Sequence, residues 1–134
     1  MKKVRVLLSV MVTLLFVAGT ALAAGQEIIV LSPKDASTVH PDAKLGPVVV
    51  VQYEVKNFTI VDFTKVTAID ESQGHIHIQL DNQPFTTIHN ASNVWVYGGV
   101  KPGKHALTLE LVHSNHTPLE NRVVKTIHFT MAAK

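Results

Sequence analysis

The amino-acid sequence predicts an all-β protein, an antiparallel β-sandwich of about seven or eight strands. Segments rich in Val, Ile, Thr and aromatic residues alternate between polar and apolar positions, as half-buried strands do. Gly, Pro, Asn and Asp separate these segments at short, regular intervals. No stretch after residue 23 carries a helical stripe of apolar residues. A small closed barrel is the alternative architecture.

Residues 1–23 have the pattern of a secretory signal peptide. Three basic residues precede an apolar run over residues 6–18, and small residues at 21–23 supply a cleavage site. The run is shorter than the roughly 20 apolar residues of a membrane-spanning helix, which disfavours an uncleaved anchor. We therefore expect a single domain over residues 24–134, periplasmic or secreted from a bacterial cell, and free of the membrane once the leader is removed.

The charge balance changes when the leader is set aside. The whole chain has 12 Lys and Arg residues against 10 Asp and Glu residues. Three of the basic residues and none of the acidic ones lie in the leader, so residues 24–134 carry 9 against 10, a net charge of −1. Nucleic-acid binding needs clustered Lys and Arg, and we do not expect it. The chain has no cysteine, so apolar packing must stabilise the domain without disulfides.

The expected strands follow one another from the leader to the C-terminus. They cover residues 26–33, 47–55, 58–66, 75–81, 84–89, 93–100, 105–113 and 122–131. The polar stretch 34–46 is expected to be a loop. In 75–81, "HIHIQLD", Ile76, Ile78 and Leu80 share one parity and should face the core, which leaves the two histidines on the outer face.

One segment favours a particular kind of sandwich. The stretch "GGVKPGKHALTLELV", 98–112, resembles the corner of immunoglobulin-like domains, where a Pro-Gly turn leads into an alternating strand. The resemblance implies an immunoglobulin-like antiparallel β-sandwich. His105 occupies the place where such domains usually carry a tyrosine that hydrogen-bonds back across the corner, and we expect His105 to bond to the backbone there.

A wider resemblance covers the chain from Val48 onward. Histidines recur in the patterns GHxH, PGxH and NHxPL, at "GHIH", "PGKH" and "NHTPL". These patterns resemble a group of small exported bacterial domains of unknown function. The resemblance lends no catalytic residues.

Eight histidines in one small domain point to metal chemistry, because imidazole is the commonest metal ligand in proteins. His75 and His77 lie two residues apart on one face of a strand, about 6.6 Å from each other. Both could therefore reach one ion, but two imidazoles make a poor site and further ligands are needed.

Strand order suggests where the further ligands lie. In an immunoglobulin-like sandwich the strands expected at 75–81, 105–113 and 122–131 share a sheet. Antiparallel pairing of the first two places His75 near His113 and His116, and places Glu110 near His77. The predicted metal ligands are His75, His77, His113 and His116, with Glu110 as a helper. His105 falls at the opposite end of its strand and should not share the site.

Ligand softness restricts the metal. Residues 24–134 contain no Cys and only Met131, so a Cu(I) site built on sulfur is disfavoured. Imidazole and carboxylate suit Cu(II), Zn(II) or Ni(II), and Cu(II) or Zn(II) is the ion we expect. The function predicted is an exported binding module for a divalent transition metal, in carriage or sensing.

A metal-free interpretation stays open. The His-x-His pair also suits a solvated surface, and the domain could be a structural or interaction module that binds a protein partner or another ligand through a sheet face or edge. Trp95 and Tyr97 share a face and would suit such binding if exposed, although core filling is the expectation for Trp95. No nucleophile elbow, phosphate loop or HExxH motif is present, so no enzyme activity and no catalytic residue are predicted.

Overall fold

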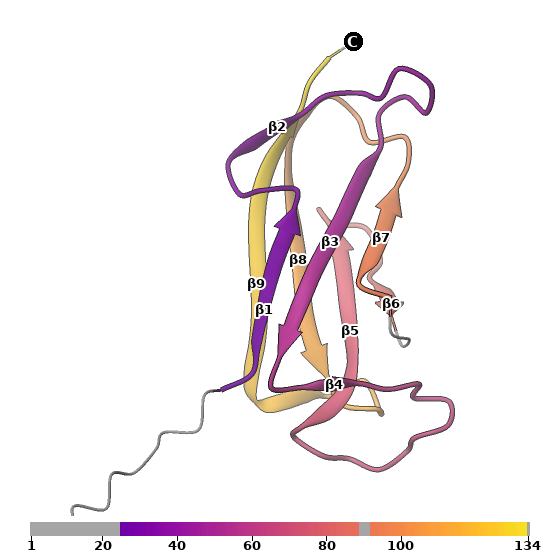
Figure 1. Ribbon diagram of the computed structural model, residues 1–134, viewed down its shortest axis with the longest axis vertical. Helices are drawn as coiled ribbons and strands as arrows, with labels where there is room; N and C mark the ends of the chain where they lie inside the picture. The colour runs from indigo at the N-terminus through magenta and orange to yellow at the C-terminus, as the bar shows by residue number, and fades with distance from the viewer. Residues whose placement is uncertain (1–24, 89–91, 134) are drawn as a thin grey trace, which may run out of the picture.

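In the computed structural model, which describes residues 25–88 and 92–133, two β-sheets pack face to face (Figure 1). The first sheet has the order β1 (Glu27–Ser32), β3 (Val49–Lys56), β7 (Val94–Tyr97). The second has the order β2 (Ser37–Val39), β9 (Pro118–Met131), β8 (Gly103–Val112), β5 (Gln73–Leu80), β4 (Thr59–Ile60), and β6 (Thr86–Ile88) also pairs with β5. The predicted all-β sandwich is confirmed. The predicted leader, 1–23, lies outside the described residues.

The core lies between the sheets and follows the period of two in the sequence. In β3, Val49, Val51 and Tyr53 are buried while the residues between them are exposed. The second sheet contributes buried apolar residues from four strands: Ile76, Ile78 and Leu80 of β5, Ile88 of β6, Leu107, Leu109 and Leu111 of β8, and Ile127, Phe129 and Met131 of β9. Full burial of one such side chain contributes about 1.5–3 kcal/mol, so this packing stabilises a domain that has no disulfide.

The strand order of the second sheet contains the pairing on which the predicted site depends. β5, β8 and β9 share one sheet as expected, and the chain leaves the first sheet after β1 so that β2 can join the second. Two pairings depart from a purely antiparallel sandwich, because β2 runs parallel to β9 and β4 runs parallel to β5. No helix in the described ranges is long and apolar enough to cross a membrane.

Two segments differ from their predicted structure. The stretch 34–46, expected to be a loop, contains β2. The stretch 58–66, expected to be a strand, forms only the two residues of β4 before it turns away from the sheet. The cause is Asp62, whose side chain accepts hydrogen bonds from the Thr64 N–H (3.0 Å) and the Thr64 hydroxyl (2.6 Å). Such local side-chain bonds offer the backbone an alternative to a sheet ladder.

The pairing of β5 with β8 requires a glycine. Gly74 is buried, and a Cβ atom placed there would overlap the backbone carbonyl oxygen of Val112 and approach the Cα atom of His113 to 3.1 Å. Only a residue without a side chain allows β5 to lie this close to the end of β8. His75, the next residue, stands directly opposite Val112 in the register.

The predicted corner bond of His105 is confirmed. Its Nε2 atom lies 2.7 Å from the carbonyl oxygen of Lys101, and its Nδ1 atom lies 2.7 Å from Oδ2 of Asp81. Both partners only accept hydrogen bonds, so the ring satisfies them when both of its nitrogens are protonated. Burial acts to lower the pKa of His105, but the bonds to Asp81 and Lys101 outweigh it and raise the pKa above 6.5.

The hydrogen-bonded pair of His105 and Asp81 should make the free energy of unfolding depend on pH. A histidine whose pKa is raised by folding stabilises the fold below its unfolded value, 6.5, and this contribution is lost as the pH rises through the folded-state pKa. The free energy of unfolding of the wild type should therefore exceed that of His105→Gln more at pH 5.5 than at pH 9. NMR titration should give a His105 pKa that falls in Asp81→Asn. An unchanged pKa in that variant would contradict the assignment.

Gly74→Ala should destabilise the fold by about 2 kcal/mol or more, because relief of the overlap requires β5 and β8 to separate. Gly98→Ala is the matched control, since a Cβ atom there meets nothing within 4 Å. Urea denaturation of the two variants measures the difference. Equal unfolding midpoints would show that the close approach of Gly74 to Val112 does not constrain the sheet.

Candidate metal centre

Three histidine side chains meet at one end of the second sheet. His75 and His77 come from β5, and His116 comes from the turn between β8 and β9. The Nε2 atom of His75 lies 3.1 Å from Nε2 of His77 and 3.0 Å from Nδ1 of His116, and the last two atoms are 3.2 Å apart. We call these three residues the histidine triad. Its nitrogens form a nearly equilateral triangle.

Strand register brings the triad together. Alternation on β5 places His75 and His77 on the face opposite the buried Ile76 and Ile78. Antiparallel pairing sets His75 beside Val112, where β8 ends, so the turn that follows lies next to His75. In that turn His116 has φ of 65° and its N–H donates to the carbonyl oxygen of His113 at 2.9 Å. A left-handed conformation costs a non-glycine residue about 1–2 kcal/mol, and here it accompanies the contact of His116 with β5.

Hydrogen bonding does not account for this triangle. Each imidazole nitrogen has a single in-plane direction for either a proton or a lone pair. One ring N–H can be shared between the two other nitrogens, but those two nitrogens then face each other with lone pair against lone pair at about 3 Å. Three lone pairs directed at one cation satisfy all three rings together. Two nitrogen ligands about 2.0–2.1 Å from a zinc ion, at bond angles of about 95–110°, lie about 3.0–3.4 Å apart, as these nitrogens do.

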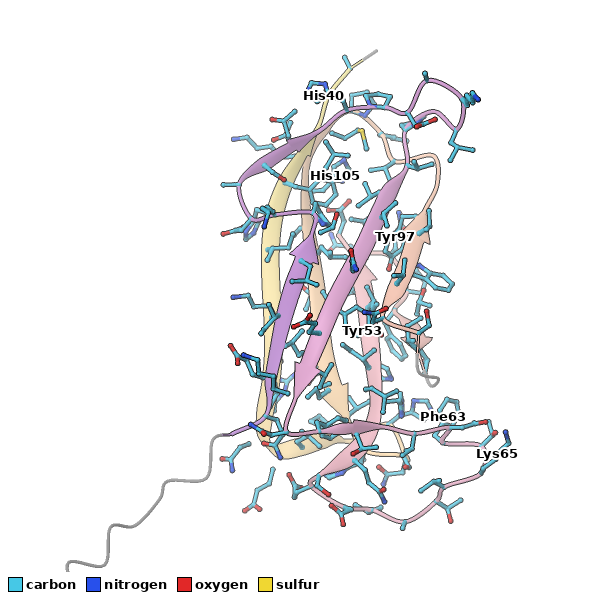
Figure 2. The ribbon with its side chains drawn as sticks, in the orientation of Figure 1. His40, Tyr53, Phe63, Lys65, Tyr97 and His105 are labelled. Carbon is cyan, nitrogen blue, oxygen red and sulfur yellow. The ribbon has the colours of Figure 1, made fainter. Side chains whose placement is uncertain are left out.

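Two phenylalanines enclose the triad. The ring of Phe63 lies 4.8 Å from that of His75 and 4.7 Å from that of His116, measured between centroids. Phe85 stacks on His77, with centroids 4.1 Å apart and planes inclined by 15°. Phe63 belongs to the loop that follows β4, and Figure 2 shows it toward the end of the sandwich opposite His105. The triad runs from the fully buried His75 through the half-buried His77 to the exposed His116.

The electrostatics of the triad favour a neutral His77. Burial is the largest cause that lowers the pKa of His77, and the neighbouring His116 lowers it further, while Glu110 acts in the opposite direction. A lowered pKa keeps the ring unprotonated near neutral pH. An unprotonated ring retains the lone pair that a metal ion requires.

His113, a predicted ligand, turns away from the triad. It is buried, its Nδ1 atom lies 3.1 Å from the carbonyl oxygen of Asp70, and its Nε2 atom lies 2.9 Å from a carboxylate oxygen of Glu71. The Glu71 carboxylate also accepts from the backbone N–H of Glu120. His113 and Glu71 therefore fasten the β4–β5 loop, which carries Phe63, to the turn that carries His116. Their contacts position the triad without joining it.

Glu110, the predicted helper, stands beside the triad but is otherwise engaged. It lies directly opposite His77 in the register, as the strand order predicts. Its Oε1 atom accepts hydrogen bonds from Nε and Nη2 of Arg122 at 2.9 and 2.7 Å. The carboxylate charge is therefore matched by a guanidinium rather than directed at the triad nitrogens.

Three other described histidines lie away from the triad. His105 belongs to the corner, and His40 and His128 are exposed. His89 lies outside the described residues. Trp95 and Tyr97 pack against the core, as expected for Trp95, while Val94 and Val96 face outward.

Sequence reasoning missed three residues that build the surroundings of the triad. Phe63 lies in the predicted strand 58–66 and Phe85 in the predicted strand 84–89, and neither segment has a pattern that indicates a contact with the histidines. Glu71 lies between two predicted strands, where no periodic pattern indicates its partners. The Asp62-x-Thr64 turn is the signal that could have placed Phe63 in a covering loop.

Comparison with known proteins gives the fold and the family. The X-ray structure of the endo-beta-1,4-mannanase from Thermotoga petrophila is similar, with a TM-score of 0.51 and 11% sequence identity. The match covers 87% of this chain and 22% of that chain, so it supports the sandwich fold alone. No curated protein matches the sequence. Residues 20–134 match the family of unknown function DUF6130, and the chain therefore belongs to that family.

Proposed function

We propose that this protein is an exported binding module that holds one divalent transition-metal ion, Cu(II) or Zn(II), through His75, His77 and His116. The observation that carries the proposal is the triangle of ring nitrogens with sides of 3.0 to 3.2 Å. This spacing suits three ligands on one ion, whereas hydrogen bonds among the rings cannot satisfy all three nitrogens at once.

The donor set supports this choice of metal. Three neutral imidazoles without a thiolate suit Cu(II) and Zn(II), and the chain has no cysteine that could favour Cu(I). We assign the ion to carriage or sensing, because no nucleophile and base pair accompanies the triad in the sequence. Export rests on the leader pattern of residues 1–23, which is the basis for a periplasmic or secreted location.

The competing function is a metal-free structural or interaction domain. It predicts an apolar patch formed by Trp95 and Tyr97, but both rings pack against the core. Val50, Val94 and Val96 are exposed on the outer face of the first sheet. These aliphatic side chains do not indicate which kind of partner would bind there. No specific observation favours this function over metal binding.

Cu(II) or Zn(II) should bind residues 24–134 with micromolar or better affinity and raise the melting temperature. Binding to the folded state alone adds about 2.7 kcal/mol of stability when the free ion is at 100 times its dissociation constant. The double variant His75→Ala, His77→Ala should lose this binding in calorimetric titration, and acidification to about pH 5 should release the ion because protons compete for imidazole.

His40→Ala and His128→Ala are the matched controls, since both residues are exposed and remote from the triad contacts. They should bind one equivalent of metal with wild-type affinity. If the double variant titrates like the wild type, the triad does not hold the metal. The metal-free function would then be the better explanation.

A further inference from the structure

We propose that the metal centre is open on one side and takes a small anion from solution. This inference rests on the proposed function and specifies the chemistry of the same site. The histidine triad supplies three ligands, and a divalent transition-metal ion takes at least one more.

The triad supplies its ligands from one side. Three nitrogens about 3.1 Å apart would hold an ion at about 2.0–2.1 Å from one side only. All three bonds then point into one hemisphere of the ion. The opposite hemisphere is free for at least one additional ligand, as it is in zinc sites that keep an exchangeable position.

No fourth His, Cys, Asp or Glu side chain joins the triad in the described part of the chain. Among the described His, Cys, Asp and Glu residues, the group that could share an ion consists of the triad only. The two other predicted donors are committed, His113 to Glu71 and Asp70, and Glu110 to Arg122. We assign the additional position to a ligand from solution, because none of these side chains fills it.

Charge selects the class of that ligand. Three neutral imidazoles leave the full charge of a divalent cation uncompensated, and the nearby Glu110 carboxylate is already matched by Arg122. An anion that binds the ion directly relieves this charge at the shortest separation. A neutral ligand such as water fills the position but does not compensate the charge of the ion.

Access and space limit the size of the ligand. His116 is exposed, so solvent reaches the triad at the β8–β9 turn. The rings of Phe63 and Phe85 lie against the triad, so we assign the position to a ligand of a few atoms rather than to a bulky one.

The test uses Co(II) as a spectroscopic substitute for the ion and azide as the small anion. Co(II) loaded into residues 24–134 should give visible bands that change in intensity and position as azide is added, with saturation at one azide per ion. The variant His116→Ala should give neither the protein-bound Co(II) bands nor the azide response. An exchangeable water should also appear as deuterium modulation in pulsed EPR of the Cu(II) form in D2O.

A second variant tests the charge argument. Arg122→Ala leaves the Glu110 carboxylate unmatched beside His77, so azide should bind to the Co(II) form several-fold more weakly. Lys125→Ala, which removes an exposed positive charge from the same strand without breaking a described ion pair, is the control. Equal azide affinity in Arg122→Ala and Lys125→Ala would overturn selection of the ligand by charge.

The outcomes separate this inference from the proposed function. If Co(II), Cu(II) and Zn(II) all fail to bind, the proposed function is wrong and the open site falls with it. If the metal binds but azide leaves the Co(II) spectrum unchanged and Cu(II) shows no exchangeable water, the centre is closed. In that case metal binding stands and the open site alone is refuted.

Discussion

The antiparallel pairing of β5 with β8 is the constraint on which the candidate site depends. It places Ile76 and Ile78 against Leu111 and Leu109 in the core, and the same register sets His75 beside Val112 and His77 beside Glu110. A shift of one residue would turn the histidines into the core and the isoleucines toward solvent. Apolar burial thus fixes the position of two imidazoles, and Gly74 allows the strands to approach closely enough at that end.

The enclosure of the triad comes from segments outside the sheet. The β4–β5 loop places Phe63 against His75 and His116, and the bond between Glu71 and His113 holds this loop to the β8–β9 turn. Rings that are packed by neighbours lose little freedom when they bind an ion, because their orientation is already set. The exposed His116 leaves one side of the triad accessible.

The sheets could be predicted from the sequence because their signal is local. Alternation in 75–81 identifies Ile76, Ile78 and Leu80 as core residues, and an immunoglobulin-like strand order is enough to place His116 near His75. The side chain of His113 could not be placed this way, because its direction depends on where β8 ends and on Glu71, a residue 42 positions earlier in the sequence. Phe63 and Phe85 reach the triad through loops, whose paths no periodic pattern encodes.

The most direct measurement is a crystal structure of residues 24–134 loaded with Zn(II) or Cu(II), with anomalous scattering recorded at the absorption edge of the metal. We predict one strong anomalous peak about 2.0–2.1 Å from Nε2 of His75, Nε2 of His77 and Nδ1 of His116, with a non-protein ligand on its far side. A peak at other histidines, or a fully loaded protein whose triad nitrogens lie away from any peak, would contradict it.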